Sequence, residues 1–180
     1  MSRVGGGDAV ARAAALVALF VDPVAEFGTL SGVAAAAVPE PFRSLLDHRS
    51  HMTVTMERHH GGPVSLEVVA ESRAGAAGYA REILLDGPDG RVVQFGIVRL
   101  DLAAVDAATA ARIRAGDAPL GRILIEAGVH CEVGDVALLE IVPGPHLRRL
   151  IGPHATFGRV AAIAIGGRPA IELLEVVAAG

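Results

Sequence analysis

The sequence predicts an α+β fold with a largely antiparallel sheet. Segments with strand character follow one another as neighbours, helical segments are grouped apart from them, and two strand pairs are joined by short glycine-rich turns. With 180 residues and 52% hydrophobic content, the chain suits one core. We therefore expect a single domain over residues 1–180, in which 1–39 form an N-terminal helical extension.

The first part of the chain begins with two predicted helices and then changes to period two. Residues 9–20 form an apolar run flanked by aspartate, which favours a packing helix over an export signal. Residues 40–47 are a second helix, because proline suits a first helical turn. In 51–58, methionine and valine alternate with threonine and glutamate, which predicts a half-buried strand, and 63–72 continue in the same style.

The middle of the chain predicts a hairpin followed by two helices. Strands at 78–85 and 91–102 flank "DGPDG", a strong turn signature. Residues 102–116 are helical and end at Gly116, which suits a C-terminal cap. A shorter helix is expected over 118–128.

The last part of the chain predicts three more strands, at 135–144, 157–165 and 168–177. The last two are joined through "GG", which is typical of a tight hairpin turn. These strands complete the predicted antiparallel sheet.

Composition narrows the possible partners and the compartment. A net charge of −4 offers no broad cationic surface for nucleic acid. No apolar run reaches the ~20 residues that a membrane span needs. The single cysteine, Cys131, excludes an internal disulfide framework and fits a reducing environment. We expect a soluble cytoplasmic protein with neither a nucleic-acid nor a membrane partner.

The residue inventory also argues against a cofactor. All 16 basic residues are arginine, which excludes a lysine Schiff base, a pyridoxal phosphate aldimine and a P-loop lysine. His48, His51, His59 and His60 cluster in sequence, but no complete ligand set at motif spacing accompanies them. Cys131 lacks an activating motif. We therefore expect neither a metal nor an organic cofactor.

Arg81 is an anomaly in the strand at 78–85. Alternation places it on the same face as the apolar Tyr79, Ile83 and Leu85. A guanidinium taken out of water costs several kcal/mol unless an anion meets it. Either a strand glutamate or a ligand anion would meet this need.

A second anomaly lies in the strand at 168–177, where two glutamates occupy opposite faces. Glu175 shares a face with Leu173 and Val177, whereas Glu172 shares the other face with Leu174. The phase of the strand leaves open which of the two faces the core.

Five segments in this order and at these intervals resemble the chorismate lyase (chorismate pyruvate-lyase) family: "HMTVTM", "YAREILL", "DAPLGRIL", "FGR" and "GRPAIELLEVV". The resemblance covers residues 40–178. It implies a six-stranded or slightly larger antiparallel sheet with helical flaps over an internal ligand cavity. It also implies conversion of chorismate to 4-hydroxybenzoate and pyruvate without metal or organic cofactor.

The resemblance further implies roles for individual residues. Arg81 would hold the ring carboxylate, to which Leu120 would donate its backbone N–H. Met52 would line the ring pocket. The glutamate that contacts the hydroxyl end of the product falls on Glu175, with Glu172 as the alternative.

One position departs from the family pattern. Some chorismate lyases carry a second arginine where this chain has Ile97. Arg99 lies two residues later on the same face of the predicted strand and is the candidate to replace it.

Chorismate becomes aromatic when it loses pyruvate, so the expected task of the enzyme is positioning, desolvation and proton management. Burial beside Leu173 and Val177 would favour a protonated Glu175, able to donate to the leaving enolpyruvyl oxygen as a general acid. Two alternatives stay open. One is a non-catalytic domain of the same fold that senses a small aromatic acid, and the other is a lyase that acts on a related chorismate-derived enol ether.

Overall fold

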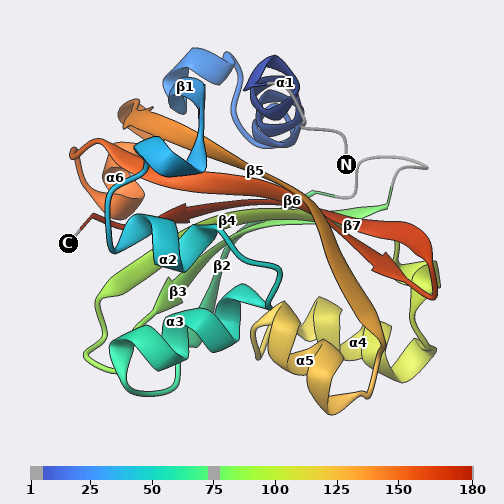
Figure 1. Ribbon diagram of the computed structural model, residues 1–180. Helices are drawn as coiled ribbons and strands as arrows, with labels where there is room; N and C mark the ends of the chain where they lie inside the picture. Colours follow the sequence, from blue (N-terminus) through green and yellow to red (C-terminus); the bar gives the residue numbers. More distant parts are fainter. Residues whose placement is uncertain (1–5, 73–77, 180) are drawn as a thin grey trace.

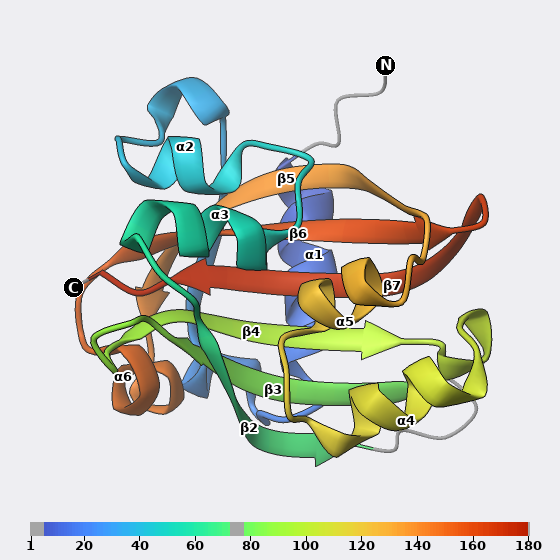
Figure 2. The ribbon, with the colours of Figure 1, turned by 90° about the horizontal axis from the view of Figure 1, so that it is seen from below.

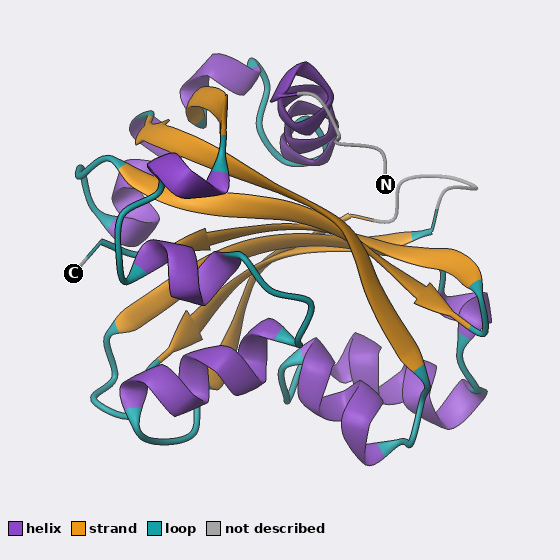
Figure 3. Cartoon of the chain, in the orientation of Figure 1, coloured by secondary structure: helices purple, strands orange, loops and turns teal. Residues whose placement is uncertain are grey.

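Seven antiparallel strands form one sheet within residues 6–72 and 78–179, the parts of the chain that the computed structural model describes. The strand order is β1-β5-β6-β7-β4-β3-β2, and every neighbouring pair is antiparallel. Helices cover both faces of the sheet (Figure 1; Figure 3). The predicted α+β class and antiparallel sheet are confirmed.

The helices are α1 (Gly6–Val17), α2 (Phe42–Leu46), α3 (Met52–His60), α4 (Ala107–Ala115), α5 (Leu120–Glu126) and α6 (Pro145–Ile151). The strands are β1 (Gly28–Val33), β2 (Ser65–Ser72), β3 (Tyr79–Asp86), β4 (Val92–Leu100), β5 (Cys131–Pro143), β6 (Thr156–Ile165) and β7 (Arg168–Val177). Positions 1–5, 73–77 and 180 of the predicted 1–180 domain lie outside the described residues.

The predicted hairpins are present. β3 and β4 pair through the loop that follows Asp86, in which Gly90 adopts a positive φ of 75°. β6 and β7 meet at Gly166 and Gly167, whose φ values of 57° and 77° suit the tight turn that "GG" predicts. The helix that we expected to end at Gly116 does so, with a left-handed Gly116 at its C-terminal cap.

The strand predicted at 51–58 is wrong, because these residues form α3. Met52 and Met56 are one helical turn apart and are both buried, whereas Val54, which a strand would have placed on their face, is 37% exposed. Gly61 ends the helix in the left-handed conformation. Over so few residues, positions 52 and 56 fit period two and period 3.6 equally well.

We had expected the N-terminal extension to be helical, but it also contains a strand, β1. β1 forms an edge strand that pairs with β5 from Gly28↔Pro143 to Val33↔Leu138. Its sequence, GTLSGV, has no buried residue and lacks the regular apolar alternation that indicates a strand.

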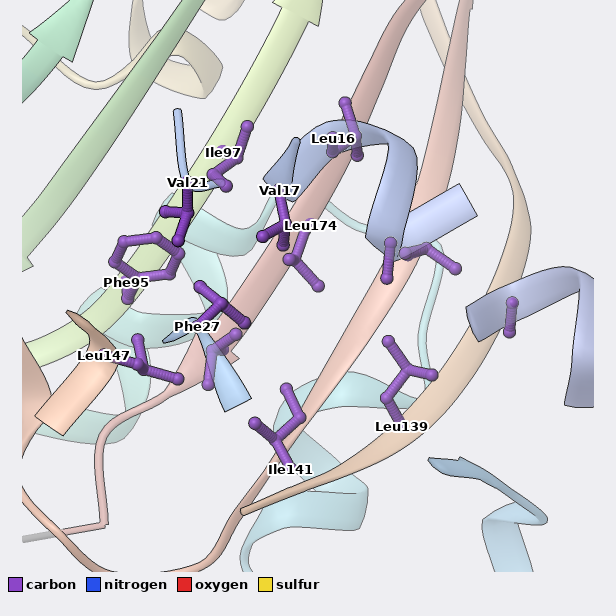
Figure 4. Packing of buried hydrophobic residues seen from close by; sticks show 14 of the residues in the cluster. Leu16, Val17, Val21, Phe27, Phe95, Ile97, Leu139, Ile141, Leu147 and Leu174 are labelled. Atoms are coloured by element: carbon purple, nitrogen blue, oxygen red, sulfur yellow. The ribbon is translucent and has the colours of Figure 1, made fainter. Parts of the chain in front are cut away.

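One apolar layer fills the outer face of the sheet, beneath α1 and α6. Leu16 and Val17 from α1 and Leu147 from α6 pack there against Ile97 and Leu174 of the sheet, as Figure 4 shows. The predicted N-terminal packing helix is thereby confirmed. None of the helices in the described residues combines the length and apolar character that crossing a bilayer requires.

The inner face carries two further clusters, beneath α2 and α3 and beneath α4 and α5. Met52 and Met56 pack with Leu85 in the first, and Ile123 and Leu124 occupy the second. A cavity lies between these two clusters and is lined by residues of both.

β6 and β7 pack so closely at Gly158 that no larger side chain fits there. A Cβ at this position would lie 2.7 Å from the backbone oxygen of Glu175, which cannot move without disturbing the β6–β7 ladder. We expect Gly158→Ala to lower the free energy of unfolding by about 1–3 kcal/mol, the usual scale of overpacking. Urea titration measures the change. Gly134→Ala is the matched control, because a Cβ there meets nothing within 4 Å; equal midpoints for the two variants would contradict the expectation.

Candidate active site

A cavity of about 60 Å³ lies between the inner face of the sheet and the starts of α3 and α5. Residues of β3, β4, β7 and β6, which are consecutive strands of the sheet, form its floor. Figure 2, seen from below, shows α3 and α5 lying across the middle of the sheet. A hydrogen-bonded floor holds its side chains at fixed spacing, whereas the two short helices form a separate cover.

The four residues singled out from the sequence all line this cavity: Met52, Arg81, Leu120 and Glu175. Arg81 projects inward from β3 together with Ile83 and Leu85, as the alternation of the strand predicts. Met52 reaches the cavity from the first turn of α3 and not from a strand.

Arg81 is buried without an ion-pair partner among the described residues. Its Nη1 donates to the backbone oxygen of Ile113 at 2.9 Å, and its Nε has no hydrogen-bond partner. Burial lowers the pKa of Arg81, while Tyr79 and Glu71 nearby favour the charged guanidinium. We had considered two partners for Arg81, a strand glutamate and a ligand anion. The structure has no ion pair between Arg81 and a strand glutamate among the described residues.

Tyr79 binds the glutamate that is paired with Arg81 across the β2–β3 ladder, Glu71. Its hydroxyl donates to Glu71 on β2 at 2.5 Å. Burial, reinforced by this hydrogen bond, raises the pKa of Tyr79 to about 12, so the phenol stays neutral at physiological pH. Glu71 is thus engaged by Tyr79 and forms no ion pair with Arg81, which lines the cavity.

Gln94 carries the second buried polar atom that lacks a partner in the described part of the chain, its Oε1. Gln94 projects from β4 and lines the same cavity as Arg81. Buried polar side-chain atoms are nearly always hydrogen-bonded in folded proteins. Two unpaired groups in one apolar cavity therefore favour a polar ligand or ordered water as their missing partner.

Arg159 is a cavity residue that we had not singled out from the sequence. It is 1% exposed, and its Nε donates to Oε2 of Glu175 at 2.7 Å across the β6–β7 ladder, where the two residues are directly paired. The alternation argument applied to Arg81 would have found it, because Arg159 shares a face of β6 with the apolar Phe157 and Ile163.

The same guanidinium also holds the segment that leads into α3. Nη1 of Arg159 donates to the backbone oxygens of His48 at 2.9 Å and Leu46 at 3.4 Å, and Nη2 donates to that of Ser50 at 3.3 Å. Arg159 therefore joins the floor of the cavity to part of its cover.

The ion pair bears on the expected acid role of Glu175. A carboxylate that accepts a charge-assisted hydrogen bond from a guanidinium is stabilised in its ionised form. This contact argues against the protonated Glu175 that burial alone led us to expect.

The two strand glutamates are separated by the faces of β7. Glu175 lines the cavity, whereas Glu172 lies on the outer face, where it forms an ion pair with Arg99. Arg99 is therefore on the opposite side of the sheet from the cavity and does not replace a second cavity arginine there. The side chain of Ile97 packs in the outer apolar layer.

The four clustered histidines have separate surroundings. No three histidine, cysteine or acidic side chains lie together as a possible metal site in the described residues. His59 and His60 are exposed at the end of α3, and their rings contact each other at 4.8 Å between centroids. His48 contacts Arg159, and His51 lines the cavity. The helix α3 separates His51, which directly precedes it, from His59 and His60 at its C-terminal end.

Comparison with protein-family models finds no match for this chain, and comparison with curated proteins finds none either.

Removal of the two buried arginines should change the stability of the fold by very different amounts. Arg159→Met leaves Glu175 and several backbone oxygens without their donor, so we expect it to lower the free energy of unfolding by about 3–5 kcal/mol, as for other broken buried pairs. Arg81→Met, the matched control, removes a charge that has no carboxylate partner and should change stability by less than about 1 kcal/mol. Denaturant unfolding without ligand measures both. Equal losses would show that Arg81 is also a structural residue.

Proposed function

We propose that this protein eliminates pyruvate from chorismate to give 4-hydroxybenzoate, as an enzyme with a chorismate lyase-like fold. The observation that carries the proposal is the unpaired, buried Arg81 in an apolar cavity that has Glu175 at its other end. The ligand that suits this arrangement is a flat, apolar ring with a carboxylate at one end and a hydroxyl group at the other.

The spacing of the polar groups supports such a ligand. Arg81 pairs with Val98 on β4, Val98 pairs with Leu173 on β7, and Glu175 lies two residues beyond Leu173. Standard strand dimensions convert this offset to about 12 Å between the Cα atoms of Arg81 and Glu175. Both side chains line the cavity, and this separation suits one six-membered ring with its substituents once the cover has moved.

The walls and the carboxylate end also suit an aromatic acid. Met52, Ile83 and Leu173 supply apolar surface for the ring. A guanidinium binds a carboxylate through two parallel hydrogen bonds and so sets its orientation. Leu120 begins α5, where backbone N–H groups have no acceptor inside the helix, and its N–H is the proposed second donor to the ring carboxylate.

Entry of the substrate requires movement of the cover. The cavity of about 60 Å³ is smaller than the roughly 150 Å³ that accommodates benzene in an engineered protein core. The floor belongs to the sheet, so the space must come from α3 and α5, which an Arg122–Glu57 ion pair joins. These two helices therefore act as the flap, opening for chorismate and excluding water after they close.

In the proposed reaction the protein contributes mostly orientation and electrostatics, because formation of an aromatic ring supplies the driving force. Arg81 fixes the ring, and the carboxylate of Glu175, held by Arg159, accepts a hydrogen bond from the ring hydroxyl. Arg159 adds positive charge at the end where the enolpyruvyl group leaves as an anion. Binding of that group by Arg159 would make up for Ile97 at the family's second arginine position.

A non-catalytic binding domain is the second candidate, and the Arg159–Glu175 ion pair favours it. A glutamate engaged by a guanidinium is a poor proton donor, while Arg81 and Gln94 suffice to recognise a small aromatic acid.

Turnover distinguishes the two candidates. Purified protein mixed with chorismate should form 4-hydroxybenzoate and pyruvate in equal amounts, followed by absorbance and by a coupled pyruvate assay. Binding of 4-hydroxybenzoate without any pyruvate formation would reject the lyase and leave the sensor domain.

Arg81→Met should abolish recognition of the acid while sparing the fold. The variant removes the partner of the ring carboxylate, so 4-hydroxybenzoate affinity should fall by about 2–5 kcal/mol, the usual cost of truncating a buried charge pair. Isothermal titration calorimetry measures the loss. If the affinity stays close to that of the parent, the acid binds elsewhere.

Glu175→Gln should slow turnover more than it weakens binding. Glutamine keeps the shape of the side chain but removes the negative charge at the hydroxyl end, so we expect kcat to fall by about 10²-fold while 4-hydroxybenzoate still binds. Glu172→Gln on the outer face is the matched control and should keep nearly the full rate. Single-turnover measurements that show the reverse order would exclude Glu175 from the reaction.

A further inference from the structure

His51 stands at the edge of the cavity, directly before the first residue of α3. A Cβ at Gly121 would lie 3.2 Å from the Cβ of His51 and 3.4 Å from its Nδ1, so the start of α5 packs closely against the imidazole. Glycine at position 121 permits this approach. The ring of His51 is thus held between the two helices that cover the cavity. It lies close enough to Glu175 for the carboxylate to favour the protonated imidazole.

The two histidines that flank Arg159 differ in how their rings are used. His48 donates from Nε2 to the backbone oxygen of Leu45 at 2.8 Å and accepts at Nδ1 from the N–H of Ser50 at 3.1 Å. Both nitrogens of His48 are therefore engaged. Neither ring nitrogen of His51 takes part in a hydrogen bond within the described residues, although the ring borders the cavity. A titratable group without a structural task, facing the proposed substrate, is available for chemistry.

We propose that His51 is the general base that removes the ring proton of the bound substrate, at the carbon that carries the hydroxyl group. This assignment rests on the proposed function. It supplies the step that Arg81, Glu175 and Leu120 leave without a residue, and it uses the end of the cavity at which the ring hydroxyl would meet Glu175.

The step balances without an oxidant or reductant. The C–H bond breaks and its proton moves to the imidazole, while its electron pair forms the new ring double bond. The adjacent C–O bond breaks and its electron pair stays on oxygen, which releases the enolate of pyruvate. The imidazolium then returns the proton to the methylene carbon of the enolate, giving pyruvate and neutral His51.

The charges around His51 suit this cycle. Burial lowers its pKa from the usual value near 6.5, and Arg159 on β6 adds to the lowering, so the ring is neutral and able to accept a proton at neutral pH. Glu175 on β7 opposes both effects and stabilises the imidazolium once it forms. Arg81 lines the same cavity from β3, while the Arg122–Glu57 pair of α5 and α3 is internally compensated.

The test compares two variants of His51 with a histidine on the same helix. His51→Gln should lower kcat by about 10²–10⁴-fold, the range of general base assistance, while 4-hydroxybenzoate affinity stays nearly unchanged. His59→Gln is the control, because His59 is exposed at the far end of α3. In His51→Ala, added imidazole should restore part of the turnover, which a purely structural role would not allow.

The pH profile gives an independent readout. In the parent protein kcat/KM should fall as the pH drops through the pKa of His51, which lies below 6.5, because protonation removes the base. This acid limb should be missing in His51→Gln.

Two outcomes overturn the assignment, and they are distinguishable. If the parent forms pyruvate and His51→Gln keeps its rate, the proposed function stands and another group is the base. If the parent forms no pyruvate from chorismate, the proposed function fails and the role of His51 fails with it.

Discussion

The ion pair between Arg159 and Glu175 is the contact on which the inner side of the molecule depends. A fully buried guanidinium is costly unless anionic and carbonyl acceptors surround it, and here one carboxylate and the backbone oxygens of Leu46, His48 and Ser50 do so. A single side chain thereby joins two central strands to the segment between α2 and α3. That segment delivers Met52 and His51 to the cavity. Arg159, in the floor, therefore holds the segment that leads into one helix of the cover.

Arg81 presents the opposite case at the other end of the same cavity. It has one backbone acceptor, an unpaired Nε and no carboxylate partner in the described residues. The cost of its burial is only partly offset in the free protein, and a bound carboxylate would offset the remainder. Proteins commonly concentrate such unfavourable features at functional sites, while other regions supply stability. The well-packed outer face beneath α1 and α6 is the region that does so here.

Much of the sheet follows from local pattern. The hairpin of β3 and β4 and that of β6 and β7 were predictable, because alternating strands flank turn residues with a defined backbone preference. The helix α3 was not predictable, since methionines four residues apart suit a strand face as well as a helix face and the segment is short. β1 was missed because an exposed edge strand needs no apolar alternation; its pairing with β5 decides its structure.

By itself, the sequence determined which side chains share a face of each strand, and so placed Arg81 among apolar residues and Glu172 opposite Glu175. The reason is local: alternation along a strand is a property of the extended backbone. Which face meets the cavity was decided only by tertiary structure, since α1 covers the side of Glu172 and α3 and α5 cover the side of Glu175. The approach of His51 to Arg159 and Glu175 was likewise decided there, because His51 lies more than 100 positions before both of them in the chain and reaches them only through the packing of α3 on the sheet.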